Sequence, residues 1–575
     1  MPGRSLGEPP RAPTMDVLRV LFALIGVASF VCGYLGLQEH FLNLKPPAPA
    51  HPSDLLYYDL QLFVLGSPPL DDGGPFPPLL NIARFSAPAV TVYAFIEAGR
   101  LVFQTELRRL RVRQARNHVI VCGDGLIANT LARRLRAGGD RVVSVPSGAV
   151  ATEPDTRRVA RAARDPDVLG AAGVGRARAL YACTDDSAAN TAIALAAARH
   201  GRYGRRSPLS VYAEVADPEL CLALQARHLG LAGQPGARVD FFHIDDLAAR
   251  KLLSQEPPVP VDGEPPRVVV VGATNFGRAV LVELARRWRL RDPRDDRPVP
   301  VALVDEEAGR ARDELTERFP FLSRACRITA YDGGLTELLA DGGLPMPPDR
   351  VFICYDDEQR ALKTALTAEQ LWHGAPGSVV VRLDRLASLR EAFGGSGERL
   401  LDDLSGTLRL YGVVRAACDP ELIGDDLARV IHESYVAARL RRGERPENAP
   451  TLVAWESLTE TLRIANRAQA EDFGSKLREL GCVLSPRVGP GEEYTLTEPD
   501  ITRLAVLEHR RWVAERIAAG WRYGEPRDDD RRLHPALVAW EKLSTEMRER
   551  NHDVIAAMPT ILADAGFRIV RLRQA

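Results

Sequence analysis

The sequence predicts a multi-domain protein: a two-helix transmembrane hairpin, two tandem α/β Rossmann-like units and a C-terminal all-α domain. Three observations predict this order. The first hundred residues hold two apolar runs of membrane-spanning length. A pattern of strand, glycine turn and helix then occurs twice, and the final segment repeats a tryptophan motif. We expect domains at residues 1–105, 117–255, 267–425 and 426–575, which suits a chain of 575 residues.

Residues 20–37 form the first predicted span, because they carry no charged side chain. Arginines precede this run, which predicts a cytoplasmic N-terminus. A cleaved signal peptide is the competing interpretation, but no A-x-A site follows. The second span is centred on residues 85–96 and can extend over 79–103. Five arginines follow it, so both termini and the soluble domains are expected in the cytoplasm, with the hairpin in the lipid bilayer of the cell (inner) membrane.

Between the spans, residues 53–69 read SDLLYYDLQLFVLGSPP. Ser53 is expected to cap a short helix over 55–65, which is too short to cross the membrane. Span, short helix and span is the layout of tetrameric cation channels. Those of the potassium type continue into a TVGYG-like filter, whereas this chain continues into GSPPLDDGG, so the ion is not assigned.

The pore candidates lie after this short helix and near the end of the second span: Leu65, Gly66, Ser67 and Glu97. Two alternatives stay open here. The short helix can be the interfacial part of a simple membrane anchor, and Glu97 can pair with Arg100 instead of facing a lumen.

The first α/β unit begins with a predicted strand over residues 117–122. The following GDGLIA matches G-x-G-x-x-A and leads into a helix over 129–137. Such a turn lets backbone N–H groups approach a pyrophosphate at the helix N-terminus. The cofactor candidates of this turn are Gly123, Gly125 and Ala128. The next strand, 141–145, lacks the acidic residue that normally binds a ribose, so a degenerate site or another ligand is an alternative.

Residues 163–201 carry A-G-V at 172–174 and C-T-D-D at 183–186, followed by Asn190. This pattern resembles the second half of an RCK domain, the regulator of potassium conductance, also called the TrkA N-terminal domain. Residues 239–253 resemble the crossover helix of that family. The resemblance implies that Thr184 and Asp185 belong to the cofactor site, with NAD(H) or another adenine nucleotide as the ligand.

After a proline-rich linker at 254–266, the unit repeats. Residues 267–286 align with 118–137, and 352–371 align with 181–200. A threonine, Thr274, replaces the middle glycine of the turn, while an aspartate now stands at the tip of the second strand. The cofactor candidates of this copy are Gly272, Asn275, Gly277 and Asp305. Because each copy lacks a different part of the fingerprint, units kept only for packing into a ring are an alternative to ligand binding.

The C-terminal domain holds four of the six tryptophans. AWESLTETLRIANR at 454–467 matches AWEKLSTEMRERNH at 539–552, with EHRRW and GWRYG between them. This pattern resembles the RyR domain, the repeat of ryanodine receptors and of many bacterial proteins. Arginine beside tryptophan or tyrosine offers a charged fork and stacking faces, which suit an anionic nucleotide derivative.

The predicted ligand residues of this domain are Trp455, Asn466, Arg467, Glu508, His509, Arg511, Trp512, Trp521, Tyr523 and Trp540. A structural Glu–Arg–Trp brace is the alternative. We expect Trp512 and Trp540 in the core, and one ligand pocket lined by Arg467, Arg511, Trp521 and Tyr523.

Composition and missing motifs exclude several function classes. A net charge of -1 gives no bulk support for a nucleic-acid partner. The eight cysteines form no CxxC pair, and the motifs HExxH, GxxxxGK[ST] and Tyr-x-x-x-Lys are absent. We therefore expect no catalytic residue, no metal and no enzyme.

Together the resemblances imply a ligand-gated ion channel, or a related membrane effector, that passes an inorganic cation. RCK-like units typically form a ring of eight, which four chains of two units would supply (4 × 2), so we expect a homotetramer. The connector 104–117 would pull on the second span. The alternatives are a membrane-anchored nucleotide sensor without a pore and, last, an NAD-dependent oxidoreductase.

Overall fold

The computed structural model describes most of the chain, in two compact units. An N-terminal unit comprises Met1–Arg116 with Ala171–Gly173, and a larger unit comprises Asn117–Gly170 with Val174–Ala575. The described residues are 13–44, 50–66, 70, 74–147, 166–200, 208–229, 237–291, 297–342, 344, 348–371, 375, 377–384, 408–445, 451–489, 491–528 and 530–572.

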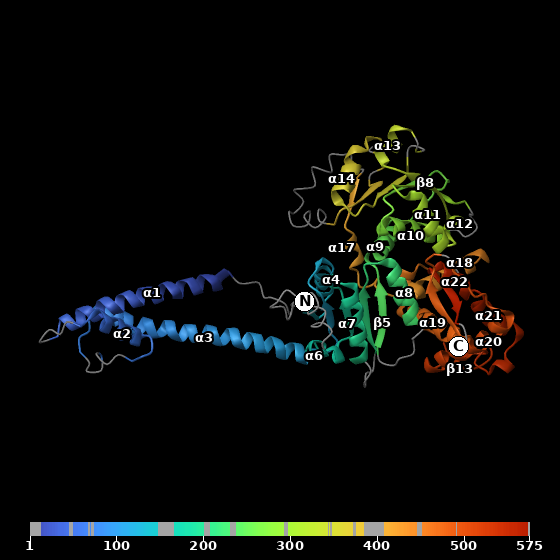
Figure 1. The fold of residues 1–575 in the computed structure, drawn as a ribbon. Coiled ribbons are helices and arrows are strands. Elements are labelled where there is room, and N and C mark those ends of the chain that lie inside the picture. The colour runs from blue at the N-terminus through green and yellow to red at the C-terminus, as the bar shows by residue number, and fades with distance from the viewer. Residues whose placement is uncertain are drawn as a thin grey trace. The chain divides into compact units, whose positions relative to one another are not determined.

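Three helices make up the described part of the N-terminal unit (Figure 1): α1 Pro13–Leu42, α2 Pro52–Leu62 and α3 Pro78–Gln114. The segments Val20–Leu42 and Pro78–Gly99 are long and apolar enough to cross a membrane, at the places the sequence predicted. The predicted connector 104–117 is helical as far as Gln114, because α3 continues through the arginine-rich stretch as one helix.

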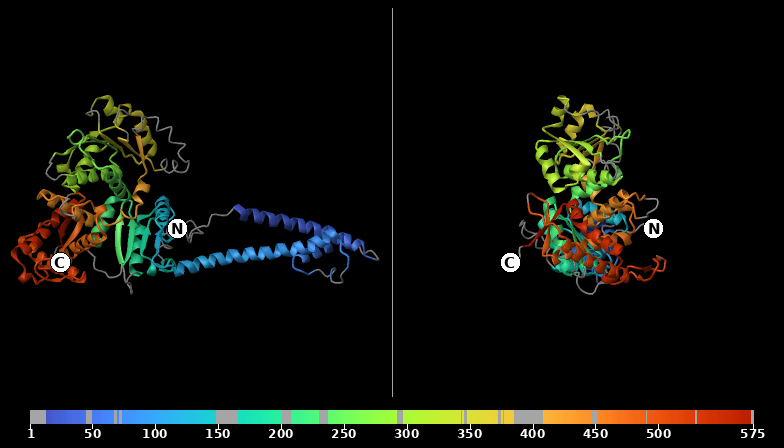
Figure 2. Two further views of the ribbon diagram at one scale, coloured as in Figure 1. Left: turned by 180° about the vertical axis from the view of Figure 1, so that it is seen from behind. Right: turned by 90° about the vertical axis from the view of Figure 1, so that its right-hand side faces the viewer.

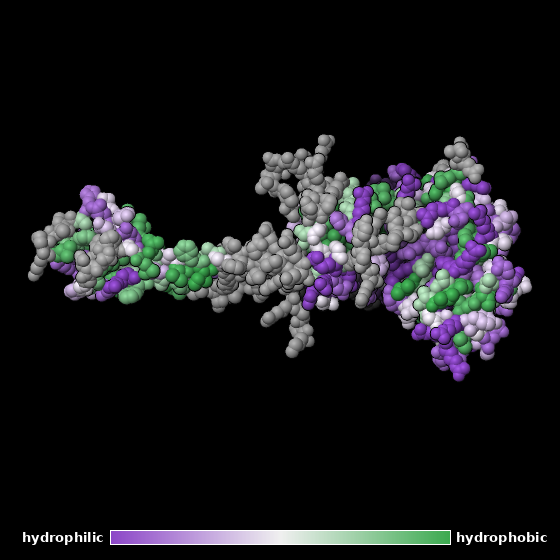
Figure 3. All heavy atoms as spheres, turned by 90° about the horizontal axis from the view of Figure 1, so that it is seen from below, coloured by the Kyte–Doolittle hydropathy of each residue, from purple (hydrophilic) through white to green (hydrophobic). Residues whose placement is uncertain are grey.

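Large apolar side chains are exposed on the helices of this unit. Figure 3 shows green patches on this unit beside purple and grey atoms. The exposed large apolar residues of α1 and α3 include Val20, Leu24, Val27, Val31, Ile82, Phe85, Phe95 and Ile96. The small core between the helices contains Leu37, Leu55, Leu62, Leu80, Ala83 and Ala87.

Two glycines of α1 let the other helices approach closely. A Cβ on Gly36 would lie 2.5 Å from the backbone nitrogen of Leu80, and a Cβ on Gly33 would lie 1.9 Å from Oδ1 of Asp59.

The expected cap of α2 is wrong. Because the helix begins at Pro52, its N-cap is His51, and the hydroxyl of Ser53 hydrogen-bonds the His51 ring at 2.8 Å instead of a helix amide.

The first α/β unit is a parallel sheet in the order β2-β1-β3-β4-β5. Its strands are β1 Val119–Cys122, β2 Val142–Val145, β3 Ala179–Ala182, β4 Leu209–Glu214 and β5 Ala237–Phe242. Its helices are α4 Leu126–Ala137, α6 Pro166–Ala171, α7 Ser187–His200 and α8 Pro218–Leu229, with the 3-10 turn η2 Val174–Arg176. Strand β1 is buried along its whole length, as its continuous apolar sequence predicts.

The second α/β unit has a parallel sheet in the order β11-β10-β9-β6-β7-β8. Its strands are β6 Val268–Val271, β7 Val299–Asp305, β8 Cys326–Asp332, β9 Arg350–Ile353, β10 Val379–Arg382 and β11 Leu408–Tyr411. Its helical elements are α10 Asn275–Arg291, α11 Ala308–Arg318, α12 Leu322–Ala325, α13 Leu335–Ala340, α14 Glu358–Thr367, η3 Glu369–Leu371 and α17 Val413–Ala417.

One helix joins the cores of the two α/β units. The predicted crossover segment consists of strand β5 and helix α9, Ile244–Gln255. Its buried residues Leu247, Ala248 and Leu252 belong to a core that also contains Leu131 of α4 and Leu281 of α10. The two units therefore share a hydrophobic core and do not meet only at their surfaces.

The C-terminal domain is largely helical, as expected (orange to red in Figure 2). Its first half contains α18 Asp426–Arg441, η5 Trp455–Ser457, α19 Glu460–Glu479 and β12 Cys482–Pro486. Its second half contains α20 Glu498–Ala518, β13 Arg522–Tyr523, β14 Leu533–His534, η6 Trp540–Lys542, α21 Thr545–Ala556, α22 Met558–Asp564 and β15 Phe567–Arg571. The strands are an addition to the expected all-α fold: β12 and β15 pair antiparallel and thereby join the two halves.

Candidate functional site

The glycine turn of the first α/β unit forms a cradle of backbone groups at the start of α4. Gly123 has φ +127°, and a Cβ there would lie 2.3 Å from the carbonyl oxygen of Cys183. Gly125 has an ordinary φ of -70° and is the N-cap of α4, where no side chain caps the helix. Ala128 packs beneath the turn, 3.0 Å from that Cβ position on Gly123. The uncapped amides of α4 are suited to bind an anion.

Across the turn, the end of β3 presents a carboxylate. Oδ1 of Asp185 lies 2.6 Å from where a Cβ on Gly125 would stand. The neighbouring Thr184 is occupied structurally, because its hydroxyl donates to Oδ1 of Asn190 at 2.7 Å and its backbone nitrogen donates to the same oxygen at 2.8 Å. Only Asp185 of this predicted pair faces the turn. It can accept a ribose hydroxyl from the end of β3, where β2 offers no acidic residue.

A buried carboxylate, that of Glu214, lies behind this pair. Burial raises the pKa of Glu214 to about 7, against the opposing charge of His243 and the hydrogen bond from Asn190. The amide nitrogen of Asn190 donates to the Glu214 carboxylate at 3.3 Å and to its backbone oxygen at 3.1 Å. These contacts tie β3, α7 and β4 together beneath the cradle.

The glycine turn of the second α/β unit is filled by its own side chains. The Thr274 hydroxyl donates to the carbonyl of Cys354 at 2.5 Å and accepts from the amide of Gly277 at 3.3 Å. The carboxylate of Asp305 accepts the amides of Ala273 at 2.9 Å and Glu307 at 3.1 Å.

The last glycine of this turn is also sterically required. A Cβ on Gly277 would lie 2.1 Å from the carbonyl oxygen of Gly272, and Asn275 is the first residue of α10. The geometry therefore favours packing over ligand binding in the second copy. The carboxylate of Asp305 already accepts two backbone N–H groups. Its expected contact with a ribose stays a prediction.

The two halves of the C-terminal domain repeat the same contacts. Nε2 of His432 donates to the carbonyl of Val453 at 2.8 Å, and Nε2 of His509 donates to that of Val538 at 2.8 Å. The ring centroid of Trp455 lies 6.0 Å from that of His432, and Trp540 lies 5.9 Å from His509. Both halves make these contacts. The contacts therefore belong to the fold of the repeat and do not by themselves mark a ligand site.

Asn466 also makes a contact that both halves share: its amide donates to the carbonyl of Leu462, and that of Asn551 donates to the carbonyl of Met547.

Glu508 and Arg511 form the brace that was the alternative to a pocket. Nε and Nη2 of Arg511 reach the two Glu508 oxygens at 3.0 and 2.7 Å, and Nζ of Lys476 lies 2.5 Å from the same carboxylate. Burial raises the pKa of Glu508, but Arg511 and Lys476 together hold it below its usual range.

An aromatic cluster distinguishes the second half. His534, on β14, lies 4.9 Å from the ring of Trp512 and 6.2 Å from that of Trp521. The guanidinium of Arg516 lies over both tryptophans, at 5.8 and 5.2 Å. Within the described part of the chain, no carboxylate lies within ion-pair distance of Arg516. We call these four residues the Arg516 cluster.

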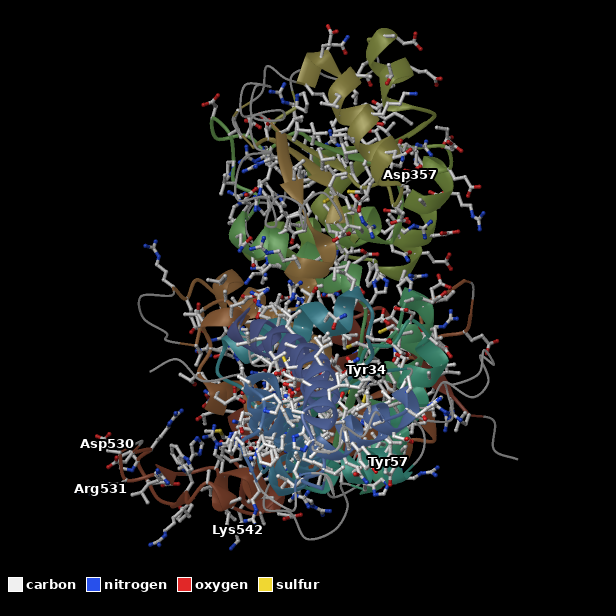
Figure 4. All side chains as sticks on the ribbon, turned by 90° about the vertical axis from the view of Figure 1, so that its left-hand side faces the viewer. Tyr34, Tyr57, Asp357, Asp530, Arg531 and Lys542 are labelled. Carbon is white, nitrogen blue, oxygen red and sulfur yellow. The ribbon has the colours of Figure 1, made fainter. Side chains whose placement is uncertain are left out.

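The expected four-residue pocket is not assembled as predicted. Arg467 lies in a different ionic cluster, bonded to Asp425 and Glu460. Tyr523 is exposed, and its hydroxyl donates to Glu525 at 3.2 Å. Only Trp521 belongs to the Arg516 cluster, while sequence reasoning missed Arg516 and His534. Asp530 and Arg531, labelled in Figure 4, are exposed in the segment before β14.

The N-terminal unit holds a buried carboxylate that sequence reasoning also missed. Asp59 of α2 is fully buried, and neither of its oxygens has a hydrogen-bond partner among the described residues. Leu55 and Leu62 share its buried face at helical spacing, which was the available signal. Of the pore candidates, Leu65 is exposed with φ +60°, Gly66 follows it, Glu97 is half-buried, and Ser67 lies outside the described residues.

Comparison with known families supports two of the domains. The TrkA-N domain model matches residues 119–230, and the RyR domain model matches residues 497–571. The chain therefore contains a TrkA-N domain in its first α/β unit and a RyR domain in its C-terminal part, as both resemblances predicted. The RyR match runs from α20 to β15, so the likeness of the first half rests on the repeated contacts.

Several solved structures of GsuK, a channel, are similar to this chain. The ADP-bound form has 15% identity and a TM-score of 0.33, covering 75% of this chain and 99% of that one. The GsuK channel has 14% identity and a TM-score of 0.34, covering 75% and 98%. The NAD-bound form has 14% identity and a TM-score of 0.30, covering 85% and 90%. The domain assignment rests on the family matches.

Proposed function

We propose that this chain is a ligand-gated membrane ion channel or channel-like effector, regulated by nucleotide-type ligands. The observation that carries this proposal is the continuity of α3. It runs as one helix from Pro78 to Gln114, and β1 begins five residues later at Val119. Because β1 leads directly into the first glycine cradle, a ligand that shifts the cradle acts on a strand joined covalently to a membrane-length helix.

The ligand of the cradle is an adenine nucleotide, with NAD(H) as the leading candidate. The amides at the start of α4 bind the pyrophosphate, and Gly123 and Gly125 give it close access to the backbone. Asp185 accepts a ribose hydroxyl. The ligand gates the protein only if it binds one arrangement of the units better than another.

Gly125→Val is expected to weaken ADP and NAD binding at least about tenfold, because the side chain occupies the pyrophosphate position. The fold should survive, since φ is ordinary and only the Asp185 side chain must move. Calorimetry on the full chain in detergent measures the affinity. Gly175→Ala, whose Cβ meets nothing within 4 Å, is the control. Native protein that binds neither nucleotide at millimolar concentration would mean that both α/β units are structural.

The Arg516 cluster is the proposed second ligand site. Its unpaired guanidinium suits an anion, and the indole rings of Trp512 and Trp521 suit a planar group. The site belongs to the RyR domain and is built on the segment that only the second half contains. An anionic nucleotide derivative combines both features.

Assembly and ion flux test the channel itself. We expect a homotetramer with both termini in the cytoplasm, whose cation flux in liposomes changes when nucleotides are added. Trp521→Ala should remove the response to a ligand of the RyR domain while flux in its absence persists. Mass photometry in detergent gives the stoichiometry, and a fluorescence flux assay gives the response. A stable dimer without flux under any ligand would favour the membrane-anchored sensor.

A further inference from the structure

A cavity of about 1160 Å³ lies where the two α/β units and the C-terminal domain meet. Its walls come from α8 and β5 of the first unit, α10 and α11 of the second, and α18 and α19 of the C-terminal domain. Neither the first glycine cradle nor the Arg516 cluster lines it. This volume lies just above the usual range for ligand sites and has room for a molecule of dinucleotide size.

Ion pairs between the domains form much of the wall. Nη2 of Arg238 lies 2.5 Å from Asp425, and Arg250 pairs with Asp426, so both bonds join the first unit to the C-terminal domain. Further pairs between domains include Arg318 with Glu219 and Arg429 with Glu283, while Arg278 pairs with Glu314 inside the second unit. Each of these wall arginines is balanced by a carboxylate.

Arg286 of α10 is different. Its Nη2 donates to the backbone oxygen of Asp564 at 2.8 Å, and its guanidinium lies 5.8 Å from the ring of Phe321. Within the described residues, no carboxylate lies within 4.0 Å of it, and its Nε has no partner. Burial and the neighbouring Arg429 lower the pKa of Arg286, against the opposing charges of Glu433 and Glu283. A half-buried cation that forms no direct ion pair is unfavourable, and an anion in the cavity would compensate it.

We propose that this cavity is a third ligand site, which binds a small organic anion through Arg286. The site goes beyond the two nucleotide sites proposed above. A planar guanidinium binds a phosphate or a carboxylate with two parallel hydrogen bonds. Apolar side chains on the same walls, including Leu222, Val282 and Phe319, pack against the body of the ligand. Because all three domains line the site, its occupant fixes their spacing.

The test measures anion binding by calorimetry on the full chain in detergent. All proteins carry Gly125→Val, so that the first cradle binds pyrophosphate at least about tenfold more weakly. Inorganic pyrophosphate and citrate are the two probes, and they distinguish a phosphate ligand from a carboxylate ligand. We expect one of them to bind at submillimolar concentration and Arg286→Gln to weaken it at least about tenfold.

Three further variants complete the design. Val282→Phe keeps Arg286 but fills the cavity from the same face of α10, so it should also weaken binding. If circular dichroism shows that Arg286→Gln does not fold, the binding affinity of Val282→Phe decides whether the cavity is the anion site. Arg286→Lys should retain part of the affinity. Arg550→Gln, on the exposed face of α21, should change nothing, because its partner Glu546 is also exposed and neither residue lines the cavity.

Two results would overturn the proposal. One is undiminished binding in both Arg286→Gln and Val282→Phe. The other is the absence of binding of either probe to the Gly125→Val protein at about 10 mM. Because nucleotide binding to the protein without Gly125→Val is measured separately, failure of this site and failure of the first cradle give different results.

Discussion

Arg429→Met is expected to lower the free energy of unfolding by about 3–5 kcal/mol, the cost of breaking a buried ion pair by removing one partner. The Arg429 side chain is only 2% exposed. Its Nη1 donates to both oxygens of Glu283 at 3.2 and 3.1 Å and to Glu433 at 2.9 Å. Without the guanidinium, two carboxylates stay in a nearly dry interface with less compensation.

The pH dependence of this loss has a definite sign. Burial raises the pKa of Glu283, but the charges of Arg429 and Arg287 together hold it well below its usual range. A lowered carboxyl pKa contributes stability above the unfolded value of about 4.3, and this contribution is lost as the pH falls through the folded value. The difference between Arg429→Met and native protein should therefore be largest near neutral pH and shrink under acid.

Denaturant unfolding and hydrogen exchange check this prediction. Glu283 lies on α10 and Arg429 on α18, so the variant should exchange faster in both helices, where the second α/β unit contacts the C-terminal domain. Arg442→Met is the control, because Arg442 and Asp553 are exposed and 3.8 Å apart. It should cost less than about 0.5 kcal/mol. Equal effects of the two substitutions would show that the buried pair contributes little.

Gly123→Val is expected to abolish nucleotide binding by disrupting the first α/β unit itself. Its φ of +127° strains any side chain, at a cost of about 1–3 kcal/mol. The Cβ would also lie 2.3 Å from the carbonyl oxygen of Cys183, a backbone atom that cannot rotate away. The end of β3 would have to move, and with it Asp185.

The comparison with Gly125→Val separates structure from binding. Gly123→Val should lower the melting temperature and the affinity together, whereas Gly125→Val should lower the affinity alone. Differential scanning calorimetry and nucleotide titration measure the two quantities. A Gly123→Val protein with the native melting temperature would show that the turn can adopt another conformation.

The sequence alone determined the order of the parts and the place of each glycine turn. Apolar length predicts spans, and a buried strand followed by glycines predicts a Rossmann turn, because both signals come from neighbouring residues. Local signals also misled. Ser53 looks like a cap, yet Pro52 starts the helix one residue earlier. The arginine-rich stretch after the second span looked like a connector, yet these residues form helices readily and α3 continues to Gln114.

Only the tertiary structure decided which polar residues are free to bind a ligand. Glu283 and Arg429 lie 146 positions apart in the chain, and nothing near either residue in the sequence identifies its partner. The same holds for Arg286, which forms no direct ion pair with a described carboxylate, and for Asp185, which faces a turn sixty residues before it. The physical reason is that periodicity tells which face of a helix is buried, whereas a charge is balanced by whatever distant element packs against that face.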